Sequence, residues 1–270
     1  MKKHRAFLKW AGGKYTLVEK ITKCLPEGEQ LIEPFVGAGS VFLNTNYESY
    51  ILSDINQDLI SLFKIIKRSP QKFIQDAKLL FTEQNNTAPA FYELRDLFNQ
   101  SDSEYQRSLL FLYLNRHCYN GLCRYNSSGE FNVPFGQYKK IYFPESEIHY
   151  FAEKAKNAQF ICTSYEKAMK KARTGSVVYC DPPYEPLSDS ANFTAYYANG
   201  FSNVQQKNLA LLAEKIAAKY QVPVLISNND TENTRVWYKN ATIFSVETRR
   251  SISRNGDGRN KIDELLALYR

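Results

Sequence analysis

We predict an α/β fold, a doubly wound and mostly parallel sheet with an inserted helical domain. Short apolar runs that are typical of strands alternate with helical patterns toward both ends of the 270-residue chain, an order that indicates parallel βαβ units. The alternation stops between about residues 67 and 146, where helical patterns dominate and a loop-rich stretch follows. A turn with two glycines follows the first strand, the place where such sheets bind ligands.

The individual elements follow from local patterns. Apolar runs predict strands over residues 31–36, 50–54, 160–162, 177–180 and 222–226. Helical spacing predicts helices after Asn56, over 71–81, 91–99 and 105–115, and after Ser202. Ser202 and Gln205 have the spacing of a capping box. Residues 188–201 and 249–261 are expected to be loops.

The composition indicates a folded, basic protein. Lys and Arg total 35 against 28 Asp and Glu, a formal charge of +7, which favours a polyanionic partner such as DNA or RNA. The longest purely apolar run, residues 109–114, is far below the ~20 residues that cross a bilayer, and the N-terminus lacks the apolar core of a signal peptide. Five Cys without Cys-x-x-Cys spacing and three His predict reduced thiols and no zinc site.

The glycine turn, residues 36–41, suggests a ligand that contains adenosine. Gly37 and Gly39 let the backbone turn tightly and approach a ligand, and Asp54 at the end of the next strand can accept both hydroxyls of a ribose. Phe42 stands where a dinucleotide fingerprint has its third glycine, which disfavours NAD. A tight strand-to-helix connection without a ligand is the alternative, and in either case a helix is expected next.

A second glycine pair lies near the N-terminus. A phosphate loop is excluded because Lys9 and Tyr15 stand where it needs Gly and Ser or Thr. The amides of Gly12 and Gly13, with Lys14, could hold a small carboxylate such as that of an amino acid. An N-terminal turn over the sheet edge is the alternative.

The tetrapeptide Asp181-Pro182-Pro183-Tyr184 directly follows an apolar strand, where open α/β sheets bind ligands. The prolines fix φ and remove two amide donors, so Asp181 and the Pro182 carbonyl are rigid acceptors. Two such acceptors suit the N–H groups of an exocyclic amine, and Tyr184 offers a face on which a base can stack. A rigid turn without chemistry is the alternative.

These residues resemble the α group of amino-methyltransferases that use S-adenosylmethionine. Residues 35–39 look like the family's Phe-x-Gly-x-Gly cofactor motif, and residues 181–184 look like its catalytic motif. The likeness is strongest to Dam-type DNA adenine-N6 methyltransferases, which act on duplex GATC, and it includes residues 7–14, 115–136 and 263–268. It implies a Rossmann-like methyltransferase fold, with a catalytic domain over 1–56 and 145–270 and an inserted target-recognition domain over 57–144.

The resemblance implies the cofactor and the chemistry. S-adenosylmethionine is the expected cofactor, S-adenosylhomocysteine the product, and no metal is implied. The implied cofactor residues are Trp10, Ala11, Gly12, Lys14, Glu33, Phe35, Gly37, Ala38, Gly39, Ser40, Asp54, Ile55, Tyr165 and Asp181. Asp181, Pro182 and Tyr184 are implied to be catalytic, with adenine N6 attacking the sulfonium methyl directly and without a covalent enzyme intermediate.

The segment from Arg116 to Lys140 combines basic and aromatic residues on a glycine-containing loop, which suits a nucleic-acid reader; an ordinary surface hairpin is the alternative. Adenine N6 lies within the duplex stack, so the base must be flipped out. The resemblance implies DNA contacts for Lys9, Arg95, Arg116, Tyr119, Asn120, Leu122, Arg124, Asn126, Asn132, Pro134, Tyr138 and Lys139. Arg124 and Lys9 are expected to read guanines.

The expected function is that of a monomeric, cytoplasmic enzyme of a bacterium or phage that methylates adenine N6 in double-stranded DNA at GATC. Mismatch repair and DNA replication are the processes that such a mark serves. One rival is an RNA or protein-glutamine amino-methyltransferase with the same tetrapeptide. Another is a non-catalytic DNA-binding regulator, against which the intact Asp54, Asp181 and Tyr184 argue. Gln137 stands where some family members carry a basic residue, so one phosphate contact is expected to be absent.

Overall fold

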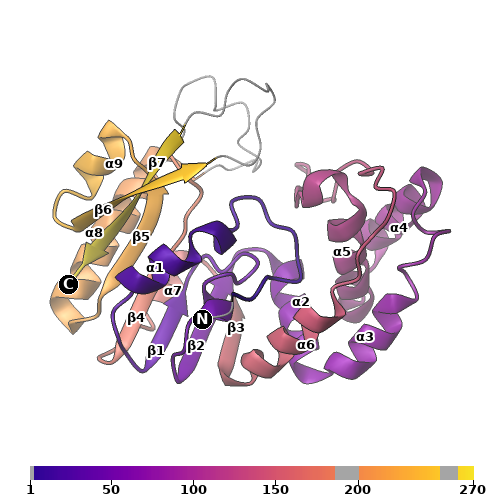
Figure 1. Ribbon diagram of the computed structural model, residues 1–270, viewed down its shortest axis with the longest axis horizontal. Helices are drawn as coiled ribbons and strands as arrows, with labels where there is room; N and C mark the ends of the chain where they lie inside the picture. The colour runs from indigo at the N-terminus through magenta and orange to yellow at the C-terminus, as the bar shows by residue number, and fades with distance from the viewer. Residues whose placement is uncertain (1–2, 186–200, 250–260) are drawn as a thin grey trace. The chain divides into compact units, whose positions relative to one another are not determined.

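A computed structural model describes residues 3–185, 201–249 and 261–270, which group into two compact units (Figure 1). Unit 1 consists of Met1–Tyr15, Val36–Asn44 and Ser53–Cys162, and unit 2 of Thr16–Phe35, Thr45–Leu52 and Thr163–Arg270. Unit 1 therefore contains the whole predicted insertion together with the glycine turn. The functional boundaries at residues 57 and 144 stay a prediction. None of the helices in the described part of the chain has the length and apolar character needed to span a membrane.

A mostly parallel seven-stranded sheet confirms the predicted α/β class. Its strands are β1 (Gln30–Glu33), β2 (Ser49–Asp54), β3 (Ala158–Cys162), β4 (Ser176–Cys180), β5 (Val224–Asn229), β6 (Thr242–Arg249) and β7 (Lys261–Tyr269), in the order β3-β2-β1-β4-β5-β7-β6. β1 pairs in parallel with β2 and β4, and β4 with β5, whereas β7 pairs antiparallel with β5 and β6. The sequence predicted neither β7 nor β6, and the first residues of β6 show no clean alternation of buried and exposed positions.

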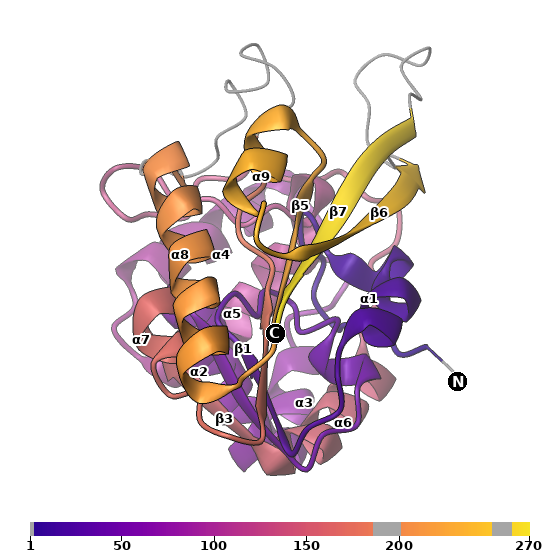
Figure 2. The ribbon, with the colours of Figure 1, turned by 90° about the vertical axis from the view of Figure 1, so that its left-hand side faces the viewer.

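The helices of unit 2 lie on both faces of its strands. They are α1 (Val18–Cys24), α7 (Tyr165–Met169), α8 (Asn203–Tyr220) and α9 (Glu232–Trp237). Figure 2 shows α7 and α8 on one face and α1 on the other. The predicted capping box at the start of α8 is confirmed, because Ser202 Oγ accepts from the Gln205 N–H while the Gln205 side chain accepts from the Ser202 N–H. Most of the two loops predicted after β4 and after β6 lies outside the described residues.

The helices of unit 1 form a bundle. They are α2 (Gln57–Arg68), α3 (Pro70–Lys78), α4 (Ala88–Gln100), α5 (Glu104–His117) and α6 (Glu145–Lys154). Helix α5 contacts α2, α3 and α4, which explains why its residues 110–115 are all buried. The Asn56 side chain accepts from the Leu59 N–H at 3.0 Å and caps α2 as predicted.

The prediction of a helix after the glycine turn is wrong, since only the single 3₁₀ turn η2 (Phe42–Asn44) forms there. The Asn44 side chain explains the stop. Its Nδ2 donates to the Ser40 carbonyl at 2.8 Å, the acceptor that the Asn44 N–H would use in an α-helix. The same amide pairs with both backbone groups of His4, donating to its carbonyl at 2.9 Å and accepting from its N–H at 2.8 Å.

The N-terminal segment packs on the end of α5 through Asn115. This buried amide accepts from the Lys9 N–H at 2.9 Å and donates to the Lys9 carbonyl at 2.7 Å and to the Gly121 carbonyl at 3.3 Å. Gly121 has a φ of +64°, and a Cβ there would overlap the Lys9 side chain. Close approach of two backbone segments therefore requires glycine at position 121.

Replacing Gly121 with Ala should destabilise the protein more than the same change at Gly129. Both glycines have positive φ, +64° and +77°, but a Cβ on Gly129 would meet nothing within 4 Å. The backbone strain is therefore common to both variants, and the clash with Lys9 is expected to cost Gly121→Ala about 1–3 kcal/mol more. Urea unfolding of both variants measures this difference, and equal losses would contradict the close packing of Lys9 on Gly121.

Candidate functional site

The glycine turn is held by Asp54 at the end of β2. Gly37 and Gly39 adopt φ angles of +47° and +76°, which residues with a side chain rarely adopt. The Gly37 N–H donates to Asp54 Oδ2 at 3.2 Å, and the Asn56 N–H donates to Asp54 Oδ1 at 3.0 Å. Burial raises the pKa of Asp54, and these donors, with the Ile55 N–H, oppose the rise. Turn and carboxylate thus form one local arrangement within unit 1.

Trp10 lies against this turn, a contact that the sequence did not predict. A Cβ on Gly37 would come within 2.8 Å of the Trp10 indole Nε1, so a glycine at position 37 leaves the space that the ring occupies. Lys14 is buried, and its Nζ donates to the Gly12 carbonyl at 2.7 Å. Of the other predicted cofactor residues in unit 1, Ala11 is exposed, Ala38 and Ser40 are buried, and Ile55 is 67% exposed.

Three aromatic rings gather in unit 2, two of them predicted. Phe35 and Tyr165 stack with ring centroids 5.4 Å apart and an interplanar angle of 21°. Phe201 meets both rings edge-on, at 5.7 and 5.5 Å. The sequence offered no signal for Phe201, because no chemistry-bearing pattern surrounds it. Glu33, also predicted, is buried at the end of β1.

Asp181 is held by a serine of the neighbouring strand. Cys180 pairs with Ile226 in parallel register, so Ser227 comes level with Asp181. Ser227 Oγ lies 2.9 Å from Asp181 Oδ1 and 3.0 Å from the Tyr179 hydroxyl. Because a carboxylate only accepts, Ser227 donates to Asp181 and accepts from Tyr179. Burial and the charge of Asp181 raise the pKa of Tyr179, which keeps its hydroxyl protonated as a donor.

The two residues after Pro182 are also fixed. The Pro183 carbonyl accepts from Gln206 Nε2 of α8 at 2.8 Å. The Tyr184 hydroxyl donates to Glu264 Oε2 of β7 at 2.8 Å, and burial raises the pKa of Tyr184 well above its ordinary value. The tetrapeptide is therefore anchored from a strand on one side and from a helix on the other, consistent with the rigidity that its prolines predict.

Glu185 extends this anchoring through three asparagines. Its N–H donates to Asn228 Oδ1 at 2.9 Å, its carbonyl accepts from Asn229 Nδ2 at 2.6 Å, and its Oε1 accepts from Asn233 Nδ2 at 2.8 Å. Sequence reasoning missed these anchors. A signal existed, since Ser227, Asn228 and Asn229 are polar residues at the carboxyl end of a buried strand, the edge at which Asp181 also lies.

In unit 1, the segment from Arg116 to Lys140, the basic segment, contains a turn built on Asn126. Its Oδ1 accepts from the N–H groups of Ser128 and Glu130 at 3.0 and 2.9 Å, and its Nδ2 donates to Glu130 Oε2 at 2.8 Å. Gly129 in this turn has a φ of +77°. An aspartate-or-asparagine turn of this kind is a local structure that needs no ligand.

Arg124 and Asn132 face each other across the hairpin that this turn closes, the Arg124–Asn132 hairpin. Arg124 Nε donates to Asn132 Oδ1 at 2.7 Å, and Nη2 donates to the Asn132 carbonyl at 3.1 Å. The predicted residues Arg124, Asn126 and Asn132 therefore come together. The two asparagines shape the hairpin, a role that the sequence did not indicate.

Lys9 joins the other end of the basic segment. Its Nζ lies 3.9 Å from the ring centroid of Tyr138 and donates to the Arg116 carbonyl at 3.3 Å. Burial, followed by the charge of Arg116, lowers the pKa of Lys9. The Tyr138 hydroxyl accepts from the Asn120 N–H at 2.9 Å. Asn120 has a φ of +53°, and the neighbouring Tyr119 is 53% exposed, so this predicted DNA contact presents an aromatic ring to solvent.

The remaining predicted residues are less closely grouped. Arg116 lies 5.5 Å from the Tyr142 ring centroid, and burial lowers its pKa. Arg95, on α4, lies 4.7 Å from the ring centroid of Tyr92. Leu122 is half-buried, whereas Pro134 and Lys139 are exposed. Within the ranges that the structure describes, no three His, Cys, Asp or Glu side chains gather as a metal site.

Comparisons with known proteins agree with the resemblance. The chain matches the model of the D12 class N6 adenine-specific DNA methyltransferase family over residues 10–252. A DNA adenine methylase of Serratia marcescens is 62% identical over 270 residues, covering 100% of both chains. A DNA adenine methylase of Escherichia coli (strain K12) is 59% identical and covers 100% of this chain and 97% of its own. One from Vibrio cholerae serotype O1 (strain ATCC 39541) is 58% identical, with 100% and 97% covered.

Acid should destabilise the protein through His117. This buried ring stacks on Tyr113 at 3.9 Å, and burial, opposed by a hydrogen bond to the Tyr113 carbonyl, lowers its pKa to about 4. The unfolded chain binds this proton near pH 6.5 and the folded chain only near pH 4, so stability falls as pH drops through that window, by up to about 3 kcal/mol.

Urea unfolding at pH 7 and pH 4.5 measures this loss. His117→Phe keeps an aromatic ring and removes the titration, so its stability should fall less than that of the wild type. His149→Phe, at an exposed position of α6, is the control and should retain the wild-type pH dependence. Equal acid losses in the wild type and in His117→Phe would contradict the prediction.

Proposed function

The chain belongs to the D12 class N6 adenine-specific DNA methyltransferase family and is an adenine-specific DNA methyltransferase. From this premise we propose that the enzyme takes the methyl group from S-adenosylmethionine. We also propose that it acts on duplex GATC after flipping the target base. The observation that carries the proposal is the loop after β4, in which Asp181 is oriented by the buried Ser227. A fixed carboxylate acceptor at that strand end suits an exocyclic amine such as adenine N6.

The residues around the glycine turn fit S-adenosylmethionine. Gly37 lies so close against the Trp10 ring that a Cβ would overlap it, and Asp54 is held beside this turn, where we propose that it accepts the ribose hydroxyls. The buried Lys14 is proposed to bind the methionine carboxylate. When bound, S-adenosylmethionine supplies an electrophilic methyl group on sulfur.

In unit 2, the stacked rings Phe35 and Tyr165 form an apolar surface of the kind that accepts an adenine. Glu33, Phe35, Tyr165 and Asp181 are described within unit 2 and the other proposed cofactor residues within unit 1. Each unit thus supplies part of the proposed cofactor residues, and each residue type suits the part of S-adenosylmethionine proposed for it.

The proposed roles in catalysis belong to Asp181, Pro182 and Tyr184. Asp181 and the Pro182 carbonyl accept the two hydrogens of N6, which directs the nitrogen lone pair toward the methyl group. Ser227 holds one Asp181 oxygen in place, so the acceptor is oriented before the substrate arrives. Tyr184, tethered through its hydroxyl to Glu264, offers its ring to the flipped base, a contact worth about 1–3 kcal/mol.

The basic segment is proposed to read the DNA. Flipping costs a few kcal/mol, and the exposed Tyr119 with Asn120 is proposed to fill the space that the base leaves. Arg124, oriented by Asn132, is proposed to bind a guanine edge. A monomer in the bacterial cytoplasm, marking DNA for mismatch repair or replication, remains our expectation for the enzyme in the cell.

Methylation of defined duplexes tests the proposal. Tritiated S-adenosylmethionine should label a GATC duplex and leave a duplex of scrambled site and an RNA duplex of the same sequence unlabelled. Plasmid treated with the enzyme should become resistant to a restriction enzyme blocked by methylated GATC.

Asp181→Ala should lose at least about 100-fold in rate while binding the same duplex. Label on RNA, or undiminished turnover by the variant, would contradict the proposal.

Replacing Arg124 and replacing Lys139 should change DNA binding in different ways. Arg124→Ala should relax discrimination at one guanine by about 1–3 kcal/mol, because it removes a base contact. Lys139 is exposed and is proposed to contact a phosphate, so Lys139→Ala should weaken binding to all sequences and reduce the salt slope by about one. Binding titrations at several salt concentrations on cognate and single-substituted duplexes separate the two, and a uniform loss for Arg124→Ala would contradict its role.

A further inference from the structure

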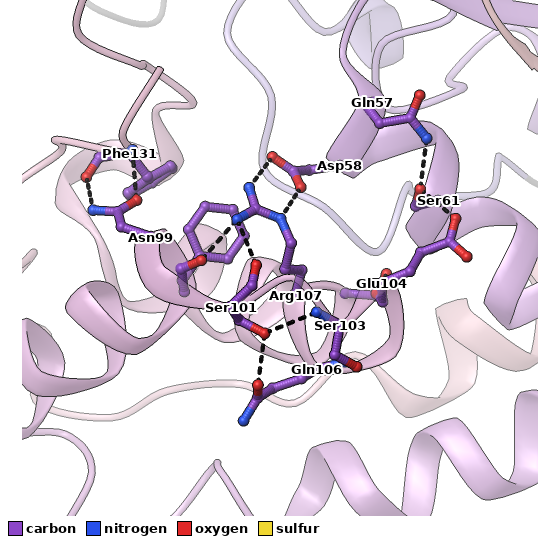
Figure 3. A network of polar contacts seen from close by, with 12 residues as sticks. Gln57, Asp58, Ser61, Asn99, Ser101, Ser103, Glu104, Gln106, Arg107 and Phe131 are labelled. Carbon is purple, nitrogen blue, oxygen red and sulfur yellow. Dashed lines mark hydrogen bonds and ion pairs between the residues drawn. The ribbon is translucent and has the colours of Figure 1, made fainter. Parts of the chain in front are cut away.

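A tyrosine of the Arg124–Asn132 hairpin bonds to a carboxylate of helix α2, and an ion pair holds that carboxylate in place. The Tyr125 hydroxyl donates to Asp58 Oδ2 at 2.7 Å. Arg107 of α5 binds the same carboxylate with two parallel hydrogen bonds, Nε to Oδ1 at 2.8 Å and Nη2 to Oδ2 at 3.0 Å (Figure 3). The fork geometry fixes both the direction and the distance of Asp58, so the tyrosine bonds an acceptor that is itself held in place.

Arg107 also fixes the end of α4. Its Nη1 donates to the Phe98 carbonyl at 2.8 Å and to the Ser101 carbonyl at 3.2 Å, and its guanidinium lies 4.1 Å from the Phe98 ring centroid. The Asp58 carboxylate raises the pKa of Arg107, mainly through the hydrogen bonds. One guanidinium therefore connects α2, the end of α4 and α5, and it stays charged over the whole working pH range.

The returning strand of the hairpin is tied to the same end of α4. Asn99 accepts from the Phe131 N–H at 2.8 Å and donates to the Phe131 carbonyl at 3.2 Å (Figure 3). The Phe131 ring meets Phe98 and Tyr125 edge-on, each at 5.9 Å. Both strands of the hairpin are thus held at Tyr125 and Phe131, the pair that forms its β-bridge.

These ties matter because Arg124 and its partner Asn132 lie directly next to them in the chain. A two-stranded hairpin is marginally stable by itself, and this one has a single bridge. Arg124 precedes the tethered Tyr125, and its partner Asn132 follows the tethered Phe131. Asn56 Nδ2 also lies 3.4 Å from Cys123 Sγ, on the other side of Arg124. A guanidinium that must meet two acceptors on one base tolerates errors of only about 0.5 Å.

We propose that Asp58, Arg107 and Tyr125 are positioning residues for base recognition, which determine specificity by fixing the direction in which Arg124 leaves the hairpin. The inference rests on the proposed guanine-reading role of Arg124. None of the three residues needs to touch DNA. Loss of their bonds lets the hairpin shift, so the enzyme accepts wrong sites more readily while its chemistry on GATC is little changed.

Tyr125→Phe is the sharpest variant, since it removes one hydroxyl and keeps the ring against Phe131. We expect the ratio of kcat/KM for GATC to that for the site altered at the guanine read by Arg124 to fall about fivefold. Most of the fall in this ratio should come from a higher KM for GATC and from faster turnover of the altered site. Tyr105→Phe is the matched control, because Tyr105 also donates to a carboxylate, Asp76 Oδ2 at 2.6 Å, but on α3. That variant should keep the wild-type ratio.

A double-mutant cycle with Arg124→Ala separates positioning from stability. If Tyr125 acts through Arg124, Tyr125→Phe adds no further loss of discrimination in the Arg124→Ala background. Arg107→Lys keeps the charge without the fork and should relax the ratio as Tyr125→Phe does. A fall in melting temperature with an unchanged ratio, or additive losses of discrimination, would overturn the inference. If Arg124→Ala itself leaves discrimination intact, the proposed reading role fails as well, so the two failures are distinguishable.

Discussion

The stretch from Asp54 to Asp58 constrains most of unit 1. Asp54 accepts from the glycine turn, Asn56 caps α2, and Asp58 accepts from Tyr125 of the hairpin. These side chains stand at the end of β2, at the N-cap of α2 and in the first turn of α2. A displacement of α2 would therefore disturb the proposed cofactor turn and the proposed DNA reader together. The fold thus brings both proposed functions onto one short stretch, where β2 ends and α2 begins, rather than onto separate loops.

Both proposed ligand carboxylates are oriented by donors that the protein supplies. Asp54 takes backbone N–H groups from Gly37 and Asn56, and Asp181 takes the Ser227 hydroxyl. A buried carboxylate without donors would be neutral, because desolvation disfavours its charge. Donors to the charged form offset that effect and also fix the direction of the oxygens. These three hydrogen bonds therefore serve both charge and geometry, the two properties that the proposed ribose and amine contacts require.

The sequence predicted what depends on near neighbours. The caps Asn56 and Ser202 were predictable because the donor and acceptor lie within three residues of each other, and the strand before Asp181 was predictable from its apolar run. The partners of the site residues were not. Ser227 and Asp181 are 46 residues apart in the chain, and Asp58 and Tyr125 are 67 apart. Which polar side chains meet across such distances depends on strand register and helix packing, which no local pattern contains. The helix predicted after the glycine turn does not form for the same reason. The Asn44 side-chain amide takes the Ser40 carbonyl that a helical N–H would use, and it also binds the distant His4.

The asparagines of the hairpin show why motif-based roles need structural interpretation. Asn126 and Asn132 match positions to which the family resemblance gives DNA contacts, yet their side chains bond to the turn and to Arg124. An amide has two donor positions and an acceptor oxygen with two lone pairs, so a side chain that shapes a hairpin can also meet a phosphate. Removing it would then change recognition in two ways, by loss of a contact and by loss of the Arg124 direction. Only a change that leaves the DNA-facing atoms intact, as at Tyr125, isolates the second effect, and for that reason the residues behind the hairpin are more informative about specificity than those on its surface.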